Sequence, residues 1–123
     1  MKKHSPRFLA LVTEAKKRIE EITSAILKEK MDQHQVFSLI DVRETQEWLS
    51  GHIPTAVHIS KGIIERDIEK KLPDFEVPIV VYCSGGFRCA LVADSLKQMG
   101  YTNVCSLGDG LQGWIDAGYP VEK

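Results

Sequence analysis

The feature that most constrains this chain is a set of short apolar runs that alternate with helical patterns. The clearest run is Ile79 to Tyr82, which follows a proline and ends just before a cysteine and two glycines. A continuous apolar run of this length is typical of a strand that helices cover on both faces, as in a parallel sheet. Further strands are predicted at residues 36–42, 56–59 and 103–107.

Helical patterns separate these strands. Ser5 and Pro6 suit the start of a helix, and an apolar stripe from Phe8 to Ile22 is expected to pack that helix on the domain rather than on a partner. A short extended piece is expected around Ile22. Further helices are predicted at residues 25–32, 44–49, 62–71, 88–99 and 110–117. This alternation predicts one α/β domain with a mostly parallel sheet, and 123 residues suffice for its core.

Composition limits the classes of partner and the compartment. The net charge of −1 gives no reason to expect binding to nucleic acid or to an anionic membrane. The three cysteines form an odd set, and the short apolar stretch near the N-terminus is interrupted too early for a secretory signal. A disulfide framework is therefore not expected, and the predicted location is a reducing cytoplasm.

The stretch VYCSGGFRCA, residues 81–90, carries the chemistry. Cys83 is expected at the carboxyl end of a central strand, the edge where ligands bind in parallel α/β sheets. Gly85 and Gly86 allow the backbone to turn its amides inward, toward the first turn of the helix that follows. Such a ring of donors, together with the helix dipole, lowers the pKa of a thiol. We therefore expect Cys83 to be a thiolate that is open to solvent.

Arg88 adds a cation, expected at the mouth of this loop, whose planar fork suits a sulfonate or phosphate. Two reactions fit: phosphoryl transfer through a phosphocysteine, and sulfur transfer through a persulfide. Four residues separate Cys83 from Arg88, whereas cysteine phosphatases place five between the corresponding residues. The smaller loop favours a single bound sulfur over three phosphoryl oxygens.

Three blocks of sequence together resemble the rhodanese-type sulfurtransferases. They are the loop CSGGFR at 83–88, LIDVRETQEWLSGHIPTAVHI at 39–59 and LGDGLQGWIDAGYPV at 107–121. Their order and spacing extend the resemblance over about residues 22–121, nearly the whole chain. The resemblance implies a three-layer fold with a five-stranded parallel sheet flanked by helices. Residues 1–21 would then be a helical extension, followed by a rhodanese domain at residues 22–123.

The resemblance also implies a reaction and its residues. Cys83 would take the outer sulfur of a small anionic donor such as thiosulfate and pass it, as a persulfide, to cyanide or a thiol. A protein sulfur donor or acceptor is the alternative to these small partners. No cofactor and no metal are expected. The predicted substrate-binding residues are Ser84, Gly85, Gly86, Phe87, Arg88 and Cys89, with Arg88 also as the contact for the donor anion.

Cys89 departs from the family, where many members have serine or threonine after the loop arginine. Its thiol could support the Cys83 sulfur weakly, or it could attack the Cys83 persulfide and leave a disulfide. The favoured interpretation is a small buried residue at the start of the helix. Asp109 also departs, standing where many members have glycine, and is expected to matter little for the chemistry.

Other polar residues are given structural roles. Asp41 and Arg43 are expected to form a supporting ion pair beneath the loop rather than to act in catalysis. His52 is expected to order a turn, while His4 and His34 are expected at the surface.

Three rival functions remain open. The protein could be a sulfur carrier that serves a protein partner, a binding module without turnover, or a cysteine phosphatase or arsenate reductase. The intact cysteine and loop disfavour the second, and the loop length disfavours the third.

Overall fold

A single sheet of five parallel strands forms the centre of the computed structural model, which describes residues 3–123. The strand order is β1-β5-β4-β2-β3, so β4 is central and β1 and β3 are the edges. The strands are β1 (Glu20–Ile22), β2 (Ser38–Asp41), β3 (Val57–His58), β4 (Ile79–Tyr82) and β5 (Val104–Leu107). The predicted parallel sheet is confirmed, although β2 and β3 are shorter than their apolar runs.

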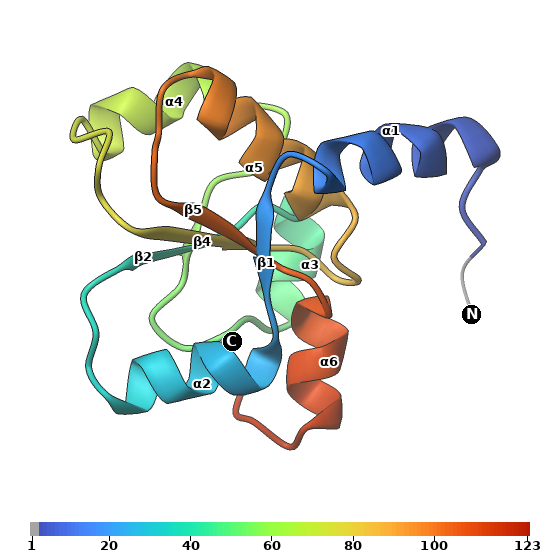
Figure 1. Cartoon of the computed structure of the whole chain (residues 1–123). Coiled ribbons are helices and arrows are strands. Elements are labelled where there is room, and N and C mark those ends of the chain that lie inside the picture. The colour runs from blue at the N-terminus through green and yellow to red at the C-terminus, as the bar shows by residue number, and fades with distance from the viewer. Residues whose placement is uncertain (1–2) are drawn as a thin grey trace.

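Helices cover both faces of this sheet, as Figure 1 shows. They are α1 (Pro6–Lys16), α2 (Ser24–Asp32), α3 (Thr45–Ser50), α4 (Ile64–Lys71), α5 (Arg88–Gln98) and α6 (Gly110–Asp116). Side chains of α4 and α5 pack with Ile40 and Val81 on one face, whereas α2 and α6 pack with Leu39 and Val80 on the other. Neighbouring strand residues thus enter opposite cores, as the two-residue period of a strand requires. The predicted three-layer α/β fold is confirmed.

The N-terminal helix α1 packs on the outside of α5. Val12 and Ala15 are buried there, which confirms the predicted packing of the apolar stripe. The helix is shorter than the stripe, however, because it ends at Lys16 and β1 begins at Glu20. Edge pairing of Ile22 with Leu107 takes this part of the stripe into the sheet. The division into residues 1–21 and 22–123 stays a prediction.

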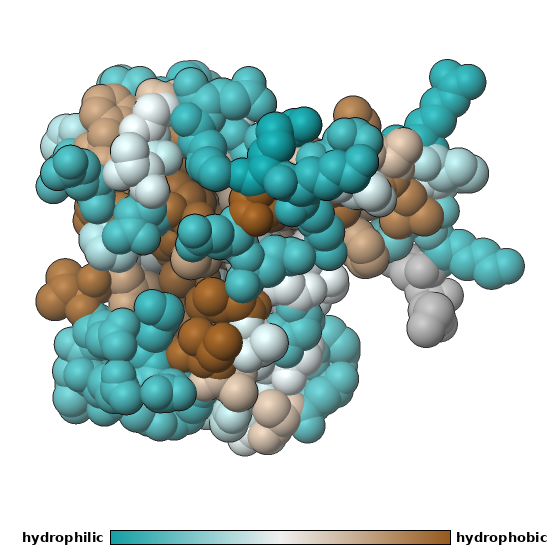
Figure 2. Space-filling model, viewed as in Figure 1, coloured by the Kyte–Doolittle hydropathy of each residue, from teal (hydrophilic) through white to brown (hydrophobic). Residues whose placement is uncertain are grey.

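The surface in Figure 2 is mostly hydrophilic, with hydrophobic side chains on α1 and between the upper and lower helices. The N-terminal end of α1 projects beyond the body of the molecule in this view. Within residues 3–123, none of the helices is long and apolar enough to cross a bilayer.

Candidate active site

The loop after β4 holds Cys83 at the carboxyl edge of the sheet. Its carbonyl groups are fixed by the start of α6, because the Leu111 amide donates to the Cys83 oxygen at 2.8 Å and the Gln112 amide donates to the Ser84 oxygen at 3.0 Å. These two bonds satisfy amides of a first helical turn, which have no partner within their own helix. With its carbonyls held outward by α6, the loop presents amides to its own interior.

Three donors surround the Cys83 sulfur. The amides of Gly86 and Cys89 donate to Sγ at 3.2 and 3.4 Å, and the Cys89 thiol lies 3.5 Å away. The Cys89 thiol and then the two amides favour the thiolate over the opposing effect of burial, with a smaller contribution from the positive charge of Arg88. Together they lower the pKa of Cys83 to about 6. The expected thiolate therefore has its physical basis in this structure.

Cys89 is fully buried, as the favoured interpretation of this residue requires, and its sulfur also contacts the Cys83 sulfur. The nearby Cys83 sulfur and burial raise the pKa of Cys89, so its thiol stays protonated and can donate to Cys83. The Ser106 hydroxyl in turn donates to the Cys89 sulfur at 3.0 Å. The hydrogen bonds thus run from the Ser106 hydroxyl through the Cys89 thiol to the Cys83 sulfur. All three cysteines of the protein are free thiols.

Glycine is required at two points where the loop and the β5–α6 turn approach each other. Gly86 has φ +91°, and a Cβ atom there would collide with the carbonyl of Gly108. Gly110 has φ +62°, and a Cβ atom there would collide with the carbonyl of Ser84. Both positions combine a left-handed backbone with backbone-to-backbone contact, which only glycine accepts without strain.

Arg88 lines the cavity beside Cys83, and its guanidinium is paired with a carboxylate that the sequence did not predict. Its Nη1 and Nη2 atoms donate to the Glu47 carboxylate at 2.7 and 3.0 Å, and Nη2 also approaches the Ser84 hydroxyl at 3.3 Å. The Ser84 hydroxyl itself donates to Glu47 at 3.1 Å. The Arg88 guanidinium lowers the pKa of Glu47 to about 2, and the carboxylate raises that of Arg88.

Sequence reasoning missed Glu47 as a residue of the site. It lies in the first turn of α3, where its side chain and that of Glu44 form a capping box. The Glu-x-x-Glu spacing could have identified the capping box, but no local pattern reveals that its partner is an arginine 41 residues later in the chain.

Cys83 lies at the base of a cavity of about 710 Å³. The cavity is lined by Lys3, His4, Phe8, Cys83, Ser84, Gly85, Phe87, Arg88 and Gln112. The thiol is only 1% exposed, so the expectation that it would be open to solvent is wrong in this respect. His4 is partly exposed, and its ring packs edge-on against Phe87 at 4.6 Å between centroids. Because Cys83 is buried and lines this cavity, reagents reach its sulfur only by entering the cavity.

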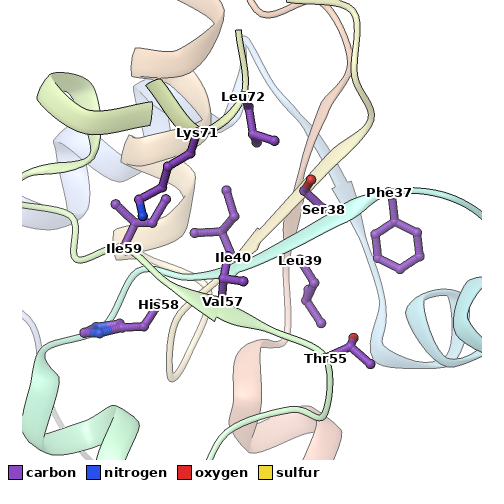
Figure 3. Close-up of a pocket in the computed structure, with 10 residues that line it drawn as sticks. All are labelled: Phe37, Ser38, Leu39, Ile40, Thr55, Val57, His58, Ile59, Lys71 and Leu72. Atoms are coloured by element: carbon purple, nitrogen blue, oxygen red, sulfur yellow. The ribbon is translucent and has the colours of Figure 1, made fainter. Parts of the chain in front are cut away.

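A second cavity, of about 340 Å³, lies at the β2–β3 edge and the end of α4 (Figure 3). It is lined by Phe37, Ser38, Leu39, Ile40, Thr55, Val57, His58, Ile59, Lys71 and Leu72. Figure 3 shows Leu39 and Ile40 pointing to opposite sides of β2. No cysteine or carboxylate lines this cavity, so the reactive groups of the described chain meet at Cys83 instead.

The supporting polar residues lie away from the cavity. Arg43 pairs with Asp41 at 2.7 Å, both side chains are buried, and Arg43 also donates to the Gly51 carbonyl. His52 stacks on Trp48 with 3.5 Å between ring centroids, which fits a role in ordering the turn. None of these residues lines the Cys83 cavity.

Asp109 joins two helices. Its carboxylate accepts bonds from the amide and the hydroxyl of Ser24 at 3.1 and 3.0 Å, which ties the start of α2 to the start of α6. Asp109 thus has a structural role, in linking two helices, that its expected position in a turn did not suggest.

Curated relatives of this chain are named as sulfurtransferases or as a sulfur carrier. The chain is 38% identical over 96 residues to YtwF of Bacillus subtilis, a proposed sulfurtransferase. This match covers 78% of this chain and 90% of YtwF. It is 33% identical to the thiosulfate sulfurtransferase GlpE of Haemophilus influenzae, over 84% of this chain and 94% of GlpE. A match to YrkF of Bacillus subtilis, a proposed sulfur carrier, is 31% identical and spans only 51% of that longer protein.

Solved structures agree with the fold. A Rhodopseudomonas palustris protein of unknown function, RPA3614, described as a possible tyrosine phosphatase, superposes with a TM-score of 0.88 at 28% identity over 99% of both chains. A rhodanese-related protein of Thermoplasma volcanium gives 0.72 at 29% identity, over 84% of this chain and 97% of its own. The model of the rhodanese-like domain matches residues 23–117. The chain therefore belongs to the rhodanese-like sulfurtransferase family.

Proposed function

We propose that this protein is a single-domain rhodanese that transfers a sulfane sulfur through a persulfide on Cys83. The donor is thiosulfate or a similar anion, and the acceptor is cyanide or a thiol. The observation that carries the proposal is the Cys83 sulfur at the base of a cavity, with two amides and a thiol directed at it.

The first half-reaction forms the persulfide. The Cys83 thiolate attacks the outer sulfur of thiosulfate, a new S–S bond forms, and the donor's own S–S bond breaks with its electron pair leaving on sulfite. No proton has to move, because the pKa of about 6 leaves Cys83 ionised near neutral pH. The loop amides remain beside the anionic sulfur, where charge-assisted hydrogen bonds contribute roughly 1.5–3 kcal/mol each.

The second half-reaction returns the enzyme to its starting state. A nucleophile, cyanide or a thiolate, attacks the outer sulfur of the persulfide, and the electron pair of the broken S–S bond returns to Cys83. The products are thiocyanate or a new low-molecular-weight persulfide. The Gly86 and Cys89 amides and the Cys89 thiol stabilise the thiolate that is released, as they do at the start of the cycle.

Recognition of the donor anion depends on charge at the cavity. Arg88 still favours an anion at Cys83, although Glu47 offsets part of its charge. Lys3 also lines the same cavity. The proposal also places the protein in the cytoplasm, because the reaction needs Cys83 as a free thiol.

A sulfur carrier with a protein partner is the second candidate, favoured by the similarity to YrkF and by the exposed Leu11 of α1. The carrier would form the same Cys83 persulfide but turn over thiosulfate poorly. A phosphatase reaction is disfavoured by the four-residue loop, even though RPA3614 is described as a possible tyrosine phosphatase. An assay with a chromogenic phosphate ester separates that reaction from sulfur transfer.

Intact mass spectrometry after incubation with thiosulfate tests the proposal. We expect the mass of one sulfur atom on Cys83, removed again by cyanide with release of thiocyanate. Cys83→Ser should abolish both events, whereas Cys105→Ser is the matched control, since burial raises the pKa of that thiol and it lies outside the cavity. Thiosulfate turnover by Cys83→Ser at the parent rate would refute the assignment.

A further inference from the structure

The extension before β1 supplies one wall of the Cys83 cavity. His4 and Phe8 line it, and their rings meet Phe87 of the loop with centroids 4.6 and 6.4 Å apart. The His4 and Phe8 rings also contact each other at 5.3 Å. Three rings from two distant parts of the chain thus form one aromatic wall, which we call the His4–Phe8–Phe87 wall.

This wall is held in place by α1. Arg18, just after the helix, forms two hydrogen bonds to Asp94 of α5 at 2.9 and 2.7 Å, and Lys97 donates to the Arg18 carbonyl at 2.6 Å. Val12 and Ala15 are buried against the same part of the protein. The structural match to RPA3614 covers 99% of both chains, so it includes α1, whereas the family match begins at residue 23. In Figure 1, α1 lies beside α5 at the side where the β4–α5 loop turns.

The cavity is far larger than thiosulfate. Its volume of about 710 Å³ lies within the range of about 300–1,000 Å³ that is usual for sites of small organic ligands. Thiosulfate has five heavy atoms and needs only a small part of that space beside Cys83. The remaining volume extends from the sulfur to the aromatic wall.

Charge and ring chemistry identify what would occupy this volume. Lys3 and Arg88 line the cavity, so an anion is favoured there. The aromatic wall favours a flat or apolar body packed edge-on or offset against its rings. A ligand that satisfies both has an anionic sulfur group at one end and an aromatic body at the other.

Resting on the proposed sulfur transfer, we infer that His4 and Phe8 determine specificity and select aromatic thiosulfonates over thiosulfate as sulfur donors. The Cys83 thiolate attacks the outer sulfur of R–SO₂–S⁻, an S–S bond forms on Cys83, and the donor's S–S bond breaks with its electron pair leaving on the sulfinate R–SO₂⁻. The body R stays against the His4–Phe8–Phe87 wall during this step. Contacts between R and this wall then raise kcat/KM for the aromatic donor. Thiosulfate has no such body and gains nothing from them.

Protection of Cys83 from alkylation tests the binding without any sulfur transfer. The full chain is treated with iodoacetamide in the presence of 2-naphthalenesulfonate or methanesulfonate, and the Cys83 peptide is quantified by mass spectrometry. We expect the naphthalene compound to protect Cys83 at concentrations where methanesulfonate does not. Phe8→Ala and His4→Ala should each weaken this protection about fivefold, the loss expected for one aromatic contact.

Leu11→Ala is the matched control, because Leu11 lies on the same helix with 63% of its surface exposed and does not line the cavity. It should leave the protection unchanged. In turnover, the ratio of kcat/KM for benzenethiosulfonate to that for thiosulfate should fall in Phe8→Ala and His4→Ala but not in Leu11→Ala.

Equal protection by the two sulfonates, or equal effects of Phe8→Ala and Leu11→Ala, would overturn the inference. His4→Ala keeps the test valid if Phe8→Ala disturbs α1, because His4 precedes the helix. If the parent protein formed no persulfide, the proposed function would be wrong instead. The two failures can be told apart, because the alkylation result does not depend on persulfide formation.

Discussion

Glu47 holds both terminal nitrogens of Arg88 in one ion pair, with the shorter of the two bonds at 2.7 Å. The Ser84 hydroxyl contacts both partners, so α3 and the β4–α5 loop are joined at the rim of the cavity. Arg88 is therefore a fixed part of the cavity lining, and Glu47 offsets part of its charge. This relationship makes Glu47 a positioning residue whose charge opposes the binding of an anionic donor.

Replacement of Glu47 by Gln should lower the KM for thiosulfate about twofold to fivefold. The amide keeps an acceptor for Arg88 and Ser84 but removes the negative charge, so the guanidinium acts more strongly on the anion. Arg88→Ala should raise the KM instead. Steady-state kinetics measure both, and Glu29→Gln, an equal change of charge on the exposed part of α2, is the control. A rise in KM for Glu47→Gln as large as that for Arg88→Ala would contradict this account.

The rate of Cys83 alkylation should follow a titration with its midpoint near pH 6. The thiolate reacts, so the rate should be level above the midpoint and fall about tenfold for each pH unit below it. Cys89→Ala should raise the midpoint, because the largest contribution to the low pKa of Cys83 comes from the Cys89 thiol. Cys89→Ser keeps a donor and should change it less.

Iodoacetamide rates measured from about pH 4.5 to about pH 9, with the Cys83 peptide resolved by mass spectrometry, give these midpoints. A midpoint near the ordinary cysteine value of about 8.5 in the parent protein would refute the proposed donor ring. An unchanged midpoint in Cys89→Ala would remove Cys89 from it. The same spectra also reveal any Cys83–Cys89 disulfide left by attack of Cys89 on the persulfide.

Gly86→Ala should destabilise the protein more than Gly118→Ala. Both residues have positive φ, at +91° and +83°, so each alanine costs about 1–2 kcal/mol for the left-handed backbone. At Gly118 no atom lies within 4 Å of the new Cβ, whereas at Gly86 it collides with the Gly108 carbonyl and adds about 1–3 kcal/mol. Urea unfolding measures the difference, and Gly86→Ala should also lose persulfide formation. Equal free energies of unfolding for the two variants would show that the close approach at Gly108 is not required.

Asp109→Ala should lower the free energy of unfolding by about 1–3 kcal/mol, because the buried Ser24 amide and hydroxyl lose their acceptor. Thiosulfate turnover by the folded variant should persist, since Asp109 does not line the cavity. Asp116→Ala, which removes only an exposed bond from Gln112, is the control. Thermal unfolding and turnover measured on the same samples separate the two effects, and a stable but inactive Asp109→Ala would contradict this assignment.

Local patterns predicted most of the fold. The buried run Ile79 to Tyr82 became β4, and the helix expected from Arg88 begins there as α5. The positions of Cys83 and the loop glycines follow from these two elements, because a strand and a helix joined by a short loop have few arrangements. The inward amides of the loop could thus be expected from residues that are close in sequence.

Contacts between distant residues were beyond such patterns. Arg18 lies 76 residues from Asp94, and no periodicity shows that their pairing seats α1 on α5 and brings His4 to Phe87. The extended piece expected around Ile22 is β1, but the end of α1 at Lys16 and the pairing of β1 with β5 were not predicted.

Residue types and short-range periodicity were therefore enough to predict Cys83 as the candidate nucleophile, the strand that precedes it and the loop that lowers its pKa. Tertiary packing alone decided that Glu47 pairs with Arg88, that Cys83 is buried in a cavity and that His4 and Phe8 line the same cavity. The physical reason is that hydrogen bonds within a strand, helix or loop depend on neighbouring residues. Ion pairs and ring contacts between elements depend instead on how whole helices pack against the sheet and against one another.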